Sequence, residues 1–121
     1  MKLGSITLAL LVLSLALFSP ALAQEEEHCD HEAQAIDSLR HCVEPAYAEG
    51  HITNIGIYRA LVGQLSAAQA AVERGQTSVA INLLQAFIYT VDTQVDRAIL
   101  EPHAGHLLEH ANAVLAALSS Q

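Results

Sequence analysis

Apolar side chains recur every three or four residues along four stretches of this chain, and this spacing predicts four amphipathic helices. Long alternations of apolar and polar positions are absent from the sequence, so strands are not expected. Helices with one apolar face bury it most economically against one another. We therefore predict an all-α fold, an antiparallel up-and-down four-helix bundle with three long helices and a looser first one. The expected helices span residues 32–48, 53–74, 77–95 and 102–119.

Residues with positional preferences predict where these helices begin and end. Thr53 or Asn54 should cap the second helix, Gly75 should end it, and Thr77 should cap the third. Pro45 conflicts with the first helix, because proline has no amide proton and disfavours helical backbone before it. We therefore expect the first helix to end early or to kink at Pro45. The apolar stripes predict a core of Ile36, Leu39, Val43, Ala46, Leu61, Leu65, Ala68, Val72, Ile81, Leu83, Leu84, Phe87, Ile88, Val91, Val95, Ala104, Leu107, Ala111, Val114 and Leu118.

The beginning of the chain has a different pattern. Lys2 precedes a nearly unbroken apolar run and then Ala21-Leu22-Ala23, a small-residue cleavage site, which together predict a secretory signal peptide over residues 1–23. The alternative is an uncleaved anchor, although the run is shorter than the ~20 residues of a comfortable membrane span. Residues 24–32 are polar and acidic, which predicts a flexible tail before a bundle domain over residues 33–119. We expect an exported bacterial protein, periplasmic or extracellular, with no stable membrane insertion after cleavage.

Charge and motifs exclude several functions. The 121 residues include 5 Lys+Arg and 13 Asp+Glu, for a formal charge of −8. Cleavage removes Lys2 and leaves four arginines against all 13 acidic residues, a charge of −9. Such a surface disfavours nucleic acid, whose phosphates need basic partners. The length suits one domain, and no nucleophile-elbow, zinc-protease or phosphate-loop motif is present, so an enzyme is not expected.

The apolar residues of the last three predicted helices form a more specific pattern. They read Gly56-Ile57-x-x-Ala60-Leu61-x-x-x-Leu65 with Ala68, then Gly75, then Ala80-x-x-x-Leu84-x-x-Phe87-Ile88-x-x-Val91, and finally Leu107-Leu108-x-x-Ala111-x-x-Val114-Leu115-x-x-Leu118. This pattern resembles the FIMAH domain, a small helical module often appended to secreted bacterial enzymes and surface proteins. The resemblance covers roughly residues 33–119 and implies a non-catalytic accessory or interaction module. This sequence departs from the usual setting because we expect no attached enzyme, and because it is rich in histidine.

Three of the seven histidines, His103, His106 and His110, lie on the fourth predicted helix. Their spacing of three and four residues places them within roughly 60° of one another around the helix. Imidazoles in such a stripe can converge on Zn²⁺ or Cu²⁺. Because the pattern specifies no fourth ligand, the alternative is a polar border that lies beside the apolar face, not within it, and holds no metal.

The two cysteines, Cys29 and Cys42, allow three interpretations. Exported proteins meet oxidising conditions, which favour a disulfide between them. One continuous helix would separate their Cα atoms by roughly 20 Å, whereas a disulfide needs about 4.4–6.8 Å. An intrachain bridge therefore requires the tail to fold back along a first helix that begins after about Ala33. The alternatives are an intermolecular disulfide and a metal site in which His28 and His31 join the thiolates.

Two classes of function remain. The first is an exported, non-enzymatic interaction module that uses no cofactor and binds an unknown protein partner through an exposed apolar or tyrosine-bearing patch. The second is an exported transition-metal binding protein that holds Zn or Cu on its histidines.

Overall fold

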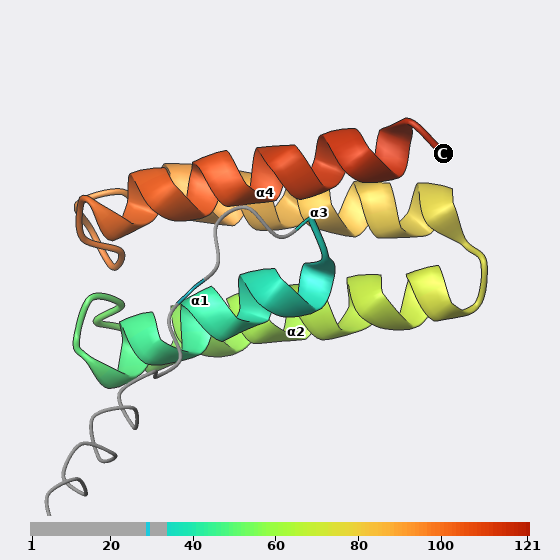
Figure 1. The fold of residues 1–121 in the computed structure, drawn as a ribbon. Helices are drawn as coiled ribbons and strands as arrows, with labels where there is room; N and C mark the ends of the chain where they lie inside the picture. Colours follow the sequence, from blue (N-terminus) through green and yellow to red (C-terminus); the bar gives the residue numbers. More distant parts are fainter. Residues whose placement is uncertain (1–28, 30–33) are drawn as a thin grey trace, which may run out of the picture.

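The computed structural model describes Cys29 and residues 34–121, in which four helices enclose one core. The helices are α1 (Ile36–Ala48), α2 (Ile55–Glu73), α3 (Thr77–Thr93) and α4 (His103–Ser119). Each helix packs against the next, α1 also packs against α4, and successive helices run in opposite directions (Figure 1). The predicted all-α, four-helix fold is confirmed, and the described part of the chain contains no sheet.

The predicted signal peptide over residues 1–23 and all of the predicted tail over residues 24–32 except Cys29 lie outside the described residues. Among the helices that the structure does describe, none is both long and apolar enough to cross a membrane.

The buried face of α3 differs from the predicted one. Its fully buried residues are Ala80, Leu84, Phe87 and Val91. Ile81 and Ile88, which lie at the centre of the predicted stripe, are only half-buried. Phe87 is the largest fully buried side chain of the described core. Because Phe87 points inward, the buried face of α3 is centred on Phe87 and not on Ile88. Ile88 therefore lies on the border that faces α4.

The expectation that the first helix could end early at Pro45 is wrong, whereas the alternative of a kink there stays a prediction. Helix α1 continues through Pro45 to Ala48, and buried residues, Val43 and Ala46, lie on both sides of the proline. Backbone hydrogen bonds secure the last turn, because Glu49 N–H donates to the Pro45 carbonyl and His51 N–H donates to the Ala46 carbonyl, both at 2.8 Å. Packing of this face and the closed turn offset the local penalty of proline.

Two of the three predicted caps are confirmed. The side chain of Asn54 accepts a hydrogen bond from Ile57 N–H at 3.0 Å, which satisfies one of the exposed amides at the start of α2. Gly75 follows α2 with φ +76°, a left-handed conformation that glycine adopts without steric cost. Thr77 does not cap α3; it is the first helical residue, and Gln76 precedes it without a side-chain cap.

Two connections meet at one end of the bundle and hold it closed. Thr53 N–H donates to the Ala98 carbonyl at 2.8 Å, and Leu100 N–H donates to the His51 carbonyl at 2.9 Å. Ile52 and Ile99 are fully buried between these connections. Helical periodicity could not identify them as core residues, because both lie outside the helices. The pairing also brings His51 beside the start of α4.

Candidate functional site

The three histidines predicted as one stripe on α4 lie in two different settings. His110 is only 1% exposed and belongs to the core, so its expected place on a polar border is wrong. Its Nε2 lies 3.2 Å from the Ser38 Oγ, and its Nδ1 lies 3.4 Å from the Cys42 Sγ. Both partners come from α1, so the imidazole links the first and last helices. The sequence could not indicate this, because the ring lies between helices far apart in the chain.

The hydroxyl of Ser38 sets the orientation of the His110 ring. Ser38 donates its single hydroxyl proton to the Ala35 carbonyl at 2.7 Å. Its oxygen therefore accepts from the Nε2–H of His110 at 3.2 Å. In this tautomer Nδ1 carries no proton, and a disulfide sulfur has none to donate, so the 3.4 Å approach of Nδ1 to the Cys42 sulfur is a packing contact.

Cys29 and Cys42 form a disulfide with a Cα–Cα distance of 4.7 Å. Cys29 lies beside Cys42, and α1 begins at Ile36, after Ala33, as the prediction of an intrachain bridge required. Cys42 is buried in the core and Cys29 is half-buried against it. The bridge therefore attaches the residue nearest the start of the described chain to the bundle.

His103 belongs to a second group of imidazoles at the end of the bundle. Its ring stacks on that of His51, with centroids 3.7 Å apart, and meets His106 edge-on at 6.3 Å. Burial lowers the pKa of His103, and the neighbouring His51 and His106 lower it further; Glu49 acts in the opposite direction. The surroundings of His103 therefore favour its neutral form over its protonated form.

This lowered pKa predicts a pH-dependent stability. Because the pKa of His103 is below 6.5 in the folded protein, the unfolded chain binds more protons as the pH falls below that value. Stability should be complete above pH ~6.5 and should decline as the pH falls through the folded pKa. Urea unfolding of His103→Gln between pH ~7.5 and ~5 should show a smaller decline than wild type.

His41→Gln is the matched control, because His41 is exposed and lies outside the imidazole group. Equal pH dependence in wild type and His103→Gln would contradict the prediction. So would a His41→Gln protein whose decline is reduced as strongly as that of His103→Gln.

The described residues bring together a set of metal-ligand atoms that differs from the predicted one. The sulfurs of Cys29 and Cys42 and a ring nitrogen of His110 all lie within 4.8 Å of one another. His103 and His106 are outside this group, and His28 and His31 are outside the described residues. The prediction of metal binding therefore stays untested, while the grouping of ligands is new.

An open groove lies between α3 and α4. It has a volume of about 440 Å³ and is lined by Gln85, Ile88, Tyr89, Asp92, Leu108, Asn112 and Leu115. Tyr89 is 70% exposed, and the three aliphatic side chains of the lining are half-buried. The lining positions on α3 are spaced by three, one and three residues, which places them on one helix face.

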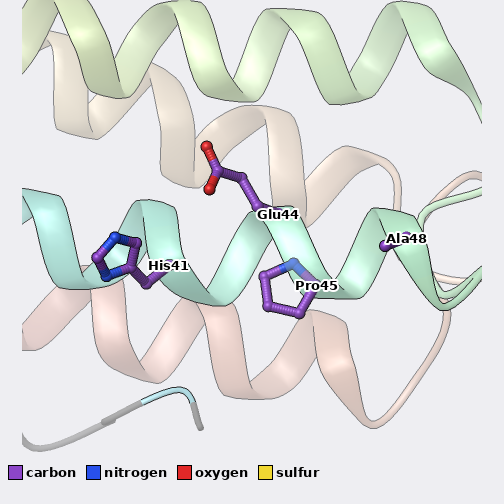
Figure 2. A pocket seen from close by; sticks show the side chains of 4 residues that line it. All are labelled: His41, Glu44, Pro45 and Ala48. Atoms are coloured by element: carbon purple, nitrogen blue, oxygen red, sulfur yellow. The ribbon is translucent and has the colours of Figure 1, made fainter. Parts of the chain in front are cut away.

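A second hollow, of about 390 Å³, lies on the outer face of α1. Figure 2 shows its four lining side chains, His41, Glu44, Pro45 and Ala48, along one side of the helix. All four lining residues come from a single helix, and Glu44 and His41 are exposed to solvent. As far as the described residues line it, this hollow is a depression on the surface of α1 beside the proline.

The fold and the bridge define a small helical-bundle domain in which a disulfide joins Cys29 to the core. The sequence model of the FIMAH domain matches residues 36–116, which include all of α1 to α3 and most of α4. This chain therefore belongs to the FIMAH domain family. Comparison with curated proteins and with solved structures finds no match.

Proposed function

We propose that this FIMAH domain is an exported, non-catalytic accessory module that binds a protein partner through the groove between α3 and α4. The observation that carries the proposal is Tyr89, which stands 70% exposed beside a hollow lined by Ile88, Leu108 and Leu115. Tyrosine combines a large apolar ring with a polar hydroxyl and is enriched in binding interfaces. The domain's core does not need this side chain, because Phe87 on the opposite side of α3 fills it.

The lining of the groove defines the chemistry of the partner. Ile88, Leu108 and Leu115 give the lining its aliphatic part, and Asp92 is the one charged residue among the described residues that line the groove. The whole chain is also acidic, with a formal charge of −8. The partner that fits is an amphipathic segment whose aliphatic side chains enter the groove and whose Lys or Arg lies beside Asp92. Binding of this kind should weaken as salt screens the charge pair.

Site-specific photocrosslinking tests whether the groove is occupied in the exporting cell. A photoreactive phenylalanine analogue placed at Tyr89 should give one defined crosslinked protein. The same analogue at Ala67, which is exposed on α2, should not give that product. The same products from both positions, or no product from Tyr89, would contradict the proposed function.

Affinity measurements on the crosslinked partner then test its chemistry. Tyr89→Ala should weaken binding by on the order of 10- to 30-fold, the range of an interface hot spot. Asp92→Asn should weaken binding and reduce its salt dependence. Asp96→Asn is the matched control, because Asp96 lies in the following turn with φ 61°, a conformation that asparagine also tolerates. Unchanged affinity in Tyr89→Ala would contradict the proposal.

A further inference from the structure

We propose that Cys29, Cys42 and His110 form a Zn²⁺ site when the Cys29–Cys42 disulfide is reduced. The same residues would then hold either the disulfide or a metal ion. The two sulfurs and the histidine nitrogen already lie within 4.8 Å of one another. Two thiolates and one imidazole are ligands that Zn²⁺ accepts together, in tetrahedral geometry. The site is independent of the groove between α3 and α4, and neither proposal depends on the other.

Part of the geometry already matches a zinc centre. With Zn–S near 2.3 Å and Zn–N near 2.05 Å, a tetrahedral ion places its sulfur and nitrogen ligands about 3.5 Å apart. The Cys42 Sγ lies 3.4 Å from the His110 Nδ1 in this structure. The two sulfurs must separate to about 3.8 Å once their bond is broken. Cys29 lies outside the helices, so this displacement does not require a helix to move.

Ser38 holds the histidine in the state that a metal requires. A ligating nitrogen must carry a lone pair, and the tautomer is fixed by a hydrogen bond to the other ring nitrogen. Here the Ser38 Oγ accepts a hydrogen bond from the Nε2–H, while its own O–H donates a hydrogen bond to the Ala35 carbonyl. The Nδ1 lone pair is thereby directed toward Cys42, on the side where the ion would bind.

Charge and access also suit a divalent ion. Two thiolates and a neutral imidazole cancel the charge of Zn²⁺, so the loaded site is neutral and carries a small burial cost. A hollow of about 120 Å³ borders both cysteines, with Glu49 and His106 on its rim. This hollow provides an entry path from solvent and room for a water molecule at the fourth coordination position.

The exchange needs a two-electron reductant, and a dithiol supplies that chemistry. The dithiol supplies two electrons and two protons and becomes a disulfide, while the S–S bond between Cys29 and Cys42 breaks to give two thiols. Zn²⁺ then displaces both thiol protons into solvent as the two metal–sulfur bonds form. A small-molecule disulfide reverses the sequence: it takes two electrons from the thiolates and two protons from solvent to give two thiols, the Cys29–Cys42 bond forms again, and Zn²⁺ is released.

The test compares oxidised and reduced protein, both stripped of metal, with Zn²⁺ added alone. Reduced protein should bind one Zn²⁺ per chain, and oxidised protein should bind at least ~10-fold more weakly. Co²⁺ in place of Zn²⁺ should give thiolate-to-metal charge-transfer absorption only in the reduced protein. Equal affinity in the two redox states, or a Co²⁺ complex without that absorption, would overturn the proposal.

Variants identify the ligands. Cys29→Ser keeps the buried residues of the core and, after reduction, should lose at least ~10-fold in Zn²⁺ affinity. His110→Ala should lose at least as much, with circular dichroism to verify its helices. His41→Ala, next to Cys42 but exposed, should bind as wild type does. Full affinity in reduced Cys29→Ser, or a larger loss in His41→Ala than in His110→Ala, would also overturn the proposal.

Discussion

Phe87→Ala is expected to lower the free energy of unfolding by about 3–5 kcal/mol. Phe87 is fully buried on α3, the helix that packs against both α2 and α4. Truncation removes the transfer free energy of the ring and leaves a cavity that close-packed neighbours fill only in part. Domains of this size are stable by only ~5–15 kcal/mol, so the variant should lose a large share of its stability. Thermal unfolding should show a midpoint lower by at least ~12 °C.

Tyr89→Ala is the control for Phe87→Ala, because the two residues lie two positions apart on the same helix. Tyr89 is 70% exposed, so its truncation should change the free energy of unfolding by less than ~0.5 kcal/mol. The pair therefore separates stability from function, since Tyr89→Ala is expected to lose partner binding while it remains folded. Similar destabilisation in the two variants would mean that the packing of α3 is not the one described here.

Removal of the disulfide is expected to have the second-largest effect on stability. The bridge joins residues 13 positions apart, and a loop of this length constrains the unfolded chain by about 3 kcal/mol in the chain-entropy model. The double variant Cys29→Ser/Cys42→Ala should therefore unfold at lower urea concentration than oxidised wild type. Measurements in metal-free buffer exclude any contribution from bound ions.

Reduced wild type provides the control for the disulfide prediction. Addition of a phosphine reductant should bring the unfolding midpoint of wild type close to that of the double variant. The same reductant should leave the double variant unchanged. An unfolding midpoint of wild type that does not respond to the reductant would show that the bridge adds no stability.

Helices α3 and α4 each have one face that stabilises the core and another face that is exposed to solvent. On α3, Phe87 fills the core while Tyr89 stands in solvent beside the groove. On α4, His110 contacts α1 while His106 is exposed. Because of this separation, a substitution at Phe87 tests folding, one at Tyr89 tests partner binding and one at His110 tests metal binding.

Much of the architecture could be predicted from the residues, because helix formation depends on contacts between near neighbours in the chain. The periodic apolar positions predicted four helices, and every predicted core residue of α4, from Ala104 to Leu118, is buried. Asn54 and Gly75 have preferences that arise from their own side chains and backbone freedom, so they marked the ends of α2 correctly. The FIMAH resemblance depended on the same apolar positions.

Features that depend on contacts between distant parts of the chain could not be predicted in the same way. Periodicity does not specify which of several apolar residues on α3 turns inward, and the size of Phe87 settled the choice in the packed bundle. Pro45 carries a local penalty that packing on both sides of it outweighs. His110 looked like a border residue because its partners, Ser38 and Cys42, lie on a helix about 70 residues earlier. Local preference therefore defined the helices, whereas packing between helices defined the groove and brought two cysteines and a histidine together.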